Sequence, residues 1–136
     1  MKPTRVFNPQ RRAFTLVEMA LVIGILLALI AVSFSVAKMS KSTQLGREAA
    51  ETLRTVFTAQ RLYLADHPAT PVSSLTNAML IPHLPNHAAT MPTVKSLAGT
   101  TLAIKITVFP PVVNDGSGAA YDPSGNSKDS LWDVGE

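Results

Sequence analysis

Thr15 and Glu18 are the residues whose types and spacing most clearly indicate chemistry. A threonine followed three residues later by a glutamate fits the capping box, in which hydroxyl and carboxylate satisfy free backbone N–H groups at a helix start. Glu18 is also the single charged residue of residues 14–37, an otherwise apolar run. A carboxylate at the centre of a bilayer costs about 2.5–3.5 kcal/mol, and less near its surface. Glu18 is therefore either a helix cap or half of an ion pair with another chain.

The apolar run is long enough to cross a membrane. As a helix rising 1.5 Å per residue, residues 14–37 span roughly 36 Å, and about 30 Å of hydrocarbon has to be crossed. A secretory signal peptide is the competing interpretation, but its apolar region is usually about 7–15 residues long. We therefore expect residues 14–37 to be a transmembrane helix.

Positive charge is concentrated before this segment. Residues 1–13 contain Lys2, Arg5, Arg11 and Arg12 and no acid, which predicts a cytoplasmic N-terminus and an extracytoplasmic C-terminal part. The formal net charge of +3 arises largely here, because eight basic and eight acidic side chains follow residue 37. That balance gives little support to a nucleic-acid partner. The chain has no cysteine, so disulfides and thiolate metal sites are excluded.

Residues 38–66 continue the helix with an amphipathic pattern. The apolar stripe recurs at steps of three and four residues, and it comprises Leu45, Ala49, Leu53, Val56, Gln60 and Leu64. A basic stripe of Arg47, Arg54 and Arg61 flanks it at seven-residue intervals. One helix is expected over residues 15–65, with Gly24 and Gly46 as weak points, and Pro68 ends it because proline disfavours helical geometry in the preceding residue.

Residues 67–136 are expected to form a small domain of loops and strands. The sequence predicts a short helix over residues 74–81 that Pro82 halts, and a strand over residues 101–109 that resumes at Val112. A terminal hairpin is expected from residues 119–121 and 131–134. The predicted fold class is α+β, a long N-terminal helix packed on a small antiparallel sheet, because so small a domain needs the helix to complete its core.

The residues around Glu18 carry a family resemblance. The string Arg-Arg-Ala-Phe-Thr-Leu-Val-Glu, residues 11–18, resembles the signature of type IV prepilins and type II secretion pseudopilins. The resemblance covers residues 5–65. It implies that a prepilin peptidase cleaves between Ala13 and Phe14 and N-methylates Phe14, and that Glu18 neutralises the N-terminus of a neighbouring subunit during assembly.

Two features depart from the family pattern. Alanine stands at position 13, where the family usually has glycine, and its Cβ is expected either to slow cleavage or to make the substrate specific to its own peptidase. No proline occurs within residues 14–65, where many pilins carry one that kinks the helix, so a straighter helix is expected.

The acidic C-terminal tail suggests two further roles. Asp122, Asn126 and Asp129 place oxygen ligands in one turn, which suits calcium, and some major pseudopilins bind calcium in a C-terminal loop. Ordinary turn chemistry explains the same residues, so no cofactor is expected and calcium stays an alternative. The tail also offers charge that complements the basic stripe of a neighbouring subunit, although a solvated helix face is as good an interpretation. Its carboxylates are Asp115, Asp122, Asp129, Asp133 and Glu136.

Taken together, these residues predict a structural subunit and no enzyme, because no catalytic arrangement is recognisable. The resemblance implies a bacterial inner-membrane protein with a periplasmic domain and a cleaved leader, residues 1–13. Its partners would be like subunits, the peptidase, an inner-membrane assembly platform and, before assembly, lipid. A membrane-anchored binding module and a DNA-uptake pilin are the alternatives. Pilus, pseudopilus and competence machinery are not distinguished.

Overall fold

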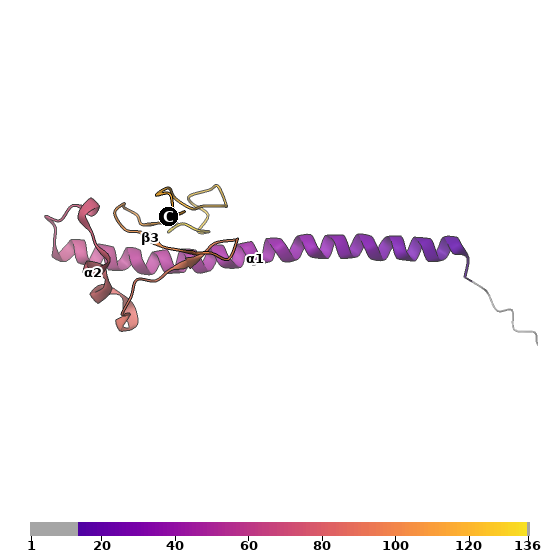
Figure 1. The fold of residues 1–136 in the computed structure, drawn as a ribbon, viewed down its shortest axis with the longest axis horizontal. Helices are drawn as coiled ribbons and strands as arrows, with labels where there is room; N and C mark the ends of the chain where they lie inside the picture. The colour runs from indigo at the N-terminus through magenta and orange to yellow at the C-terminus, as the bar shows by residue number, and fades with distance from the viewer. Residues whose placement is uncertain (1–13, 136) are drawn as a thin grey trace, which may run out of the picture. The chain divides into compact units, whose positions relative to one another are not determined.

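The structure, a computed structural model, describes residues 14–135. It divides into two compact units, Met1–Lys38 and Met39–Glu136. Helix α1 (Leu16–Asp66), 51 residues long, contributes to both units, and the short strands belong to the second (Figure 1). The α+β fold class predicted from the sequence is confirmed.

Helix α1 begins and ends within one residue of the predicted bounds. At its start the Met19 N–H donates to the Thr15 carbonyl at 3.2 Å. At its end the chain turns at His67, whose N–H donates to the Tyr63 carbonyl at 2.9 Å, before Pro68 prevents continuation. Gly24 lies within the helix without interrupting it. No proline interrupts this segment, and in the second unit the buried residues of the helix pack against the core, which stabilises the helix beyond intrinsic propensity.

In the first unit α1 is apolar and uncovered. An 18-residue window of the helix has a mean hydropathy of 2.7, and none of that window is buried within the chain. Leu16 is 85% exposed and Val36 is 63% exposed. By its length and composition, helix α1 can cross a membrane, as the sequence predicted for residues 14–37.

In the second unit α1 supplies one side of the core. Leu53 and Val56 are fully buried, as the apolar stripe predicted, and Ala59, which was not in the predicted stripe, is fully buried as well. They pack with residues from the following loops and strands, which are Leu75, Leu80, Leu84, Val94, Ile104, Ile106, Val113 and Trp132. The amphipathic half of α1 thus completes the core of a domain too small to fold around its strands alone.

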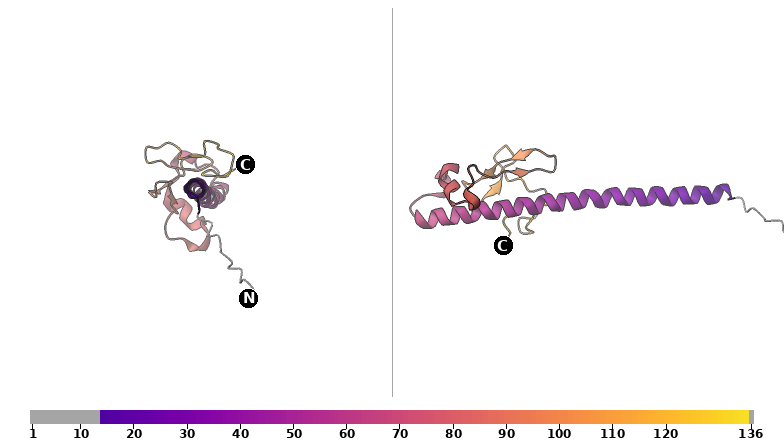
Figure 2. Two further views of the ribbon diagram at one scale, coloured as in Figure 1. Left: turned by 90° about the vertical axis from the view of Figure 1, so that its right-hand side faces the viewer. Right: turned by 90° about the horizontal axis from the view of Figure 1, so that it is seen from below.

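The strands form two antiparallel pairs. Strand β1 (Val94–Lys95) pairs with β2 (Thr101–Leu102), with Val94 opposite Leu102. Strand β3 (Ile104–Lys105) pairs with β4 (Val112–Val113), with Ile104 opposite Val113. The predicted strand over residues 101–109 is therefore divided between two sheets and ends at Lys105, whereas its resumption at Val112 is confirmed (Figure 2).

Gln60 explains why pairing stops after β3. Its side-chain Nε2 donates to the carbonyls of Ile106 and Val108, both at 2.9 Å. The two carbonyls are satisfied by the helix, so this stretch follows α1 without a strand partner. Gln60 is fully buried, and its Oε1 has no partner among the described residues. The polar member of the predicted stripe is thus a hydrogen-bonding contact between helix and loop.

The connection after α1 contains several short helices in place of the predicted one. These are η1 (Val72–Ser74), α2 (Asn77–Leu80), η2 (Ile81–His83) and η3 (Pro85–His87). The predicted helix over residues 74–81 is shorter than expected, and α2 ends at Leu80, before Pro82 as predicted. Pro82 lies in the first turn of the 3-10 helix η2, where its missing N–H is not needed for a hydrogen bond. Strand β1 was also missed, since it lies in a stretch assigned to loop.

The predicted terminal hairpin was wrong. Ala120 forms one isolated bridge with Asn114, and no strand is present over residues 131–134. The tail packs on α1 instead, where the Trp132 N–H donates to the Gly46 carbonyl at 3.1 Å. Ser130 and Trp132 have φ values of 60° and 67°, left-handed conformations that an extended strand does not contain.

Candidate functional site

Thr15 and Glu18 form the capping box at the start of α1. The Thr15 N–H donates to Glu18 Oε2 at 2.9 Å, and the Thr15 hydroxyl donates to the same oxygen at 3.1 Å. The Glu18 N–H in turn donates to Thr15 Oγ1 at 3.2 Å. Within the isolated chain, Glu18 therefore acts as a helix cap, and its Oε1 has no hydrogen bond to any of residues 14–135.

Of the predicted cleavage site between Ala13 and Phe14, the structure describes only Phe14. Phe14 is 73% exposed and directly precedes the capping box. Ala13 lies outside the described residues. An α-amine created at Phe14 would be one residue from Thr15 and would add positive charge at the helix N-terminus, next to a carboxylate.

The apolar face of α1 is the largest exposed hydrophobic surface of the first unit. Fifteen large apolar side chains from Phe14 to Val36 are about half exposed or more. Ser33 and Ser35 turn their hydroxyls back to the carbonyls of Leu29 and Ala31, at 2.8 and 3.2 Å. Because these hydroxyls are satisfied internally, the helix surface is compatible with lipid or with other apolar helices.

The basic stripe has three different environments. Arg54 is held by the tail, with Nε donating to the Val134 carbonyl at 2.9 Å and Nη2 to Ser130 Oγ at 2.8 Å. The guanidinium of Arg61 lies 5.8 Å from the centre of the Phe57 ring. Arg47 is exposed and has no hydrogen bond or ion pair with the described residues. The three arginines of the stripe therefore differ in their contacts. In the described part of the chain, Arg47 is the one that neither donates a hydrogen bond nor lies over an aromatic ring, so its guanidinium can bind a partner.

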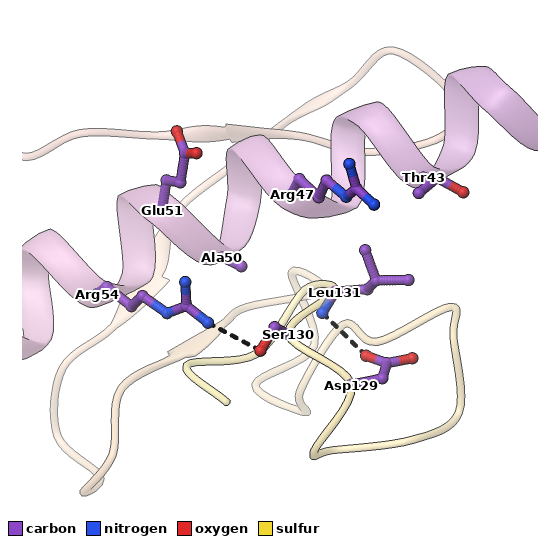
Figure 3. A pocket seen from close by; sticks show the side chains of 8 residues that line it. All are labelled: Thr43, Arg47, Ala50, Glu51, Arg54, Asp129, Ser130 and Leu131. Atoms are coloured by element: carbon purple, nitrogen blue, oxygen red, sulfur yellow. Dashed lines mark hydrogen bonds between the residues drawn. The ribbon is translucent and has the colours of Figure 1, made fainter. Parts of the chain in front are cut away.

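A cleft of about 410 Å³ lies beside the stripe (Figure 3). Its lining comes from α1 and from the tail, and it comprises Thr43, Arg47, Ala50, Glu51, Arg54, Asp129, Ser130 and Leu131. Figure 3 shows Arg54 directed to the tail, whereas the Glu51 carboxylate points away from both the tail and Arg47. The cleft carries both signs of charge, so a simple anion site is not indicated.

The three candidate calcium ligands are each engaged in their own turn. Asp122 Oδ1 accepts from the Ser124 N–H at 3.0 Å and from its hydroxyl at 2.6 Å. Asn126 Oδ1 accepts from the Lys128 N–H at 3.3 Å, and Asp129 Oδ1 from the Leu131 N–H at 2.9 Å. In the described part of the chain, no three His, Asp or Glu side chains are grouped to hold a metal. Turn chemistry explains these residues without an ion.

The tail carboxylates differ in their electrostatics. Burial raises the pKa of Asp133, and Asp129 and Asp122 raise it further by hydrogen bonding and by charge, although the Gly135 N–H acts in the opposite direction. The pKa of Asp115 is lowered, chiefly by hydrogen bonds from the Ser117 hydroxyl and N–H. The sequence predicted Asp115 and Asp133 only as a source of negative charge, and their pKa values are shifted in opposite directions.

Gly46 was predicted as a weak point of the helix, and the structure gives it a different role. A Cβ at this position would lie 2.9 Å from Trp132 Nε1 and 3.2 Å from the Leu131 side chain. The absence of a side chain lets the tail approach the helix. A glycine beside an apolar stripe was the available signal, because in that position it permits close packing.

Comparison with models of protein families, with characterised proteins and with solved structures finds no match for this chain.

Proposed function

We propose that this chain is a structural subunit of a type IV pilus-like filament or a type II secretion pseudopilus. It is stored in the bacterial inner membrane, cleaved between Ala13 and Phe14 by a prepilin peptidase, N-methylated at Phe14, and assembled through α1. The observation that carries the proposal is a single 51-residue helix that begins at the Thr15–Glu18 capping box and exposes its apolar first part.

The exposed apolar face supports storage followed by assembly. Fully burying a large apolar side chain stabilises it by about 1.5–3 kcal/mol relative to water. Fifteen such side chains on one segment therefore require a cover. Lipid supplies it before assembly, and like helices supply it in a filament, where contacts between apolar helices depend on close packing.

Glu18 supports assembly over simple anchoring. An anchor needs no carboxylate within its apolar run, because one such group opposes insertion. The capping box uses Oε2 and leaves Oε1 to accept from a cation. The Phe14 amine of an adjacent subunit is such a cation, and pairing with it would fix the register between helices.

The test is assembly in the chain's own cells. Glu18→Ala is expected to be inserted and cleaved but absent from sheared, sedimented filaments, whereas the unmodified chain is recovered in them. Normal recovery of the variant would contradict the role of Glu18. Recovery of the unmodified chain only in the membrane, with its leader retained, would favour an anchored binding module.

A further inference from the structure

The second unit carries unpaired charges of opposite sign on neighbouring flanks of α1. Arg47, Glu48 and Glu51 are all exposed. None of these three side chains has a hydrogen bond or an ion pair within residues 14–135. Consecutive helical residues are 100° apart, so Arg47 and Glu48 face different directions and do not pair with each other.

Arg47 and Glu51 are spaced for an ion pair within one helix, but they do not form it. Figure 3 shows their charged groups directed apart along α1. Exposed pairs of this spacing contribute only about 0.3–0.5 kcal/mol, which is too little to hold two long side chains against a better partner.

Among residues 14–135, no tail acid forms an ion pair with Arg47 of the same chain. Asp122 and Asp129 accept hydrogen bonds from their own turns. Asp115 accepts from the Ser117 N–H at 2.7 Å and from the Ala119 N–H at 3.1 Å. The glutamates on the exposed side of α1 have no such commitments in the described part of the chain.

Glu48 and Glu51 share a second cleft of about 500 Å³, and no tail residue lines it. Two glutamates, two threonines, two prolines and an asparagine line it, and no basic residue is among them. A guanidinium carries five N–H donors in a planar fork and no acceptor, which matches carboxylates and hydroxyl oxygens. Lys95 lies with Glu48 beside a separate, smaller cleft, and no ion pair joins the two.

We propose that this acidic cleft receives Arg47 from a second copy of the chain. The inference rests on the proposed function and names a contact between adjacent subunits. Of these two clefts, Arg47 lines only the one beside the tail and Glu48 lines only the acidic one, whereas Glu51 lines both. Because Arg47 and Glu48 face different directions, each copy offers Arg47 to one neighbour and its acidic cleft to another. A contact of this kind, between two different surfaces of the same subunit, is called heterologous. When the rotation that relates adjacent subunits does not close into a ring, a heterologous contact produces an open helical filament.

A charge-reversal experiment in trans tests this pairing. Arg47→Glu and Glu48→Arg are each expected to lower the assembled fraction at least tenfold when expressed alone in the full-length chain. Co-expression of the two variants is expected to restore assembly, since the Glu at position 47 then meets the Arg at position 48 of the other copy. Arg61→Glu is the matched control, because it reverses a charge on the same stripe and is expected to assemble. Assembly of either variant alone, or failure of the mixture, would overturn the pairing.

Disulfide trapping separates this inference from the proposed function. The chain has no cysteine, so Thr43→Cys beside Arg47 and Thr55→Cys in the acidic cleft can be introduced without background. Mild oxidation of the double variant is expected to give a ladder of linked multimers, and each single variant none. If the double variant forms filaments but no ladder of disulfide-linked multimers, the Arg47 contact is overturned and the proposed function is not. Disulfide-linked dimers of a single variant would have the same consequence. Absence of filaments from the unmodified chain would overturn the proposed function.

Discussion

Replacing Glu18 by glutamine separates the two roles of this side chain. A glutamine at the third helical position retains the capping box, because its amide oxygen accepts from the Thr15 N–H as the carboxylate does. The substitution removes the negative charge. If Glu18 acts only as a cap, Glu18→Gln assembles normally; if it pairs with the Phe14 amine of another subunit, assembly fails.

The expected magnitudes differ enough to be measured. Removing one partner of a buried, hydrogen-bonded charge pair costs about 2–5 kcal/mol, which lowers the assembly constant roughly 30-fold to several thousand-fold. Thr15→Ala is the matched variant. It removes two of the three capping hydrogen bonds and keeps the charge of Glu18. Loss of a cap costs about 1 kcal/mol, or roughly fivefold.

The assay compares sheared, sedimented filaments with subunit left in the membrane, for both variants at equal expression. N-terminal mass spectrometry on the same samples shows whether each variant was cleaved. We expect Glu18→Gln to be cleaved but unassembled, and Thr15→Ala to assemble with a modest loss. Normal assembly of Glu18→Gln together with failure of Thr15→Ala would refute the charge-pair reasoning and establish the cap as the essential feature.

Four stability predictions use thermal unfolding of the full chain in detergent. Gly46→Ala is expected to lower Tm despite the better helix propensity of alanine, because its Cβ meets the tail at 2.9 Å, whereas Gly24→Ala, with nothing within 4 Å, is not. Gln60→Leu leaves two carbonyls without their donor and is expected to cost about 1–3 kcal/mol. Burial raises the pKa of Asp133 above its ordinary value of 3.8, so ionisation of this carboxyl destabilises the folded state as the pH rises through that pKa. Asp133→Asn is therefore expected to raise Tm at pH 7 but not at pH 3. Asp115, whose pKa is lowered, stabilises the fold above that range, so Asp115→Asn should lower Tm at pH 7 only.

Helix α1 and its buried face were predictable because local rules govern them. The absence of proline sets its length, and the three- and four-residue spacing identifies Leu53 and Val56 as core. The capping box was also readable, since Thr15 and Glu18 lie within one helical turn. These features depend on residues close together in the sequence.

The strands and the tail were not predictable because distant residues determine them. Strand β3 ends at Lys105 because the Gln60 side chain donates hydrogen bonds to the carbonyls of Ile106 and Val108. Gln60 lies 46 positions before Ile106 in the sequence. The tail adopts left-handed conformations at Ser130 and Trp132 and docks at Gly46. A propensity pattern shows that such residues favour turns or strands, but not which helix carbonyl they contact.

The surroundings of the basic stripe could not be predicted from its spacing. Three arginines at seven-residue intervals were interpreted either as a contact for acidic patches of a neighbouring subunit or as a solvated helix face. The fold assigns Arg54 to the tail and Arg61 to an aromatic ring, which leaves Arg47. Likewise the tail acids, expected as a negative surface, accept hydrogen bonds from their own turns. Charge counts alone do not show which charges the fold has already paired.

The central claim is that α1 becomes an assembly element once the chain is cleaved before Phe14. Mass spectrometry of the mature N-terminus in material purified from the chain's own cells tests it most directly. We expect a chain that begins at Phe14 and carries one methyl group on its α-amine. A chain that retains Met1, or one cleaved after the apolar run, would contradict it.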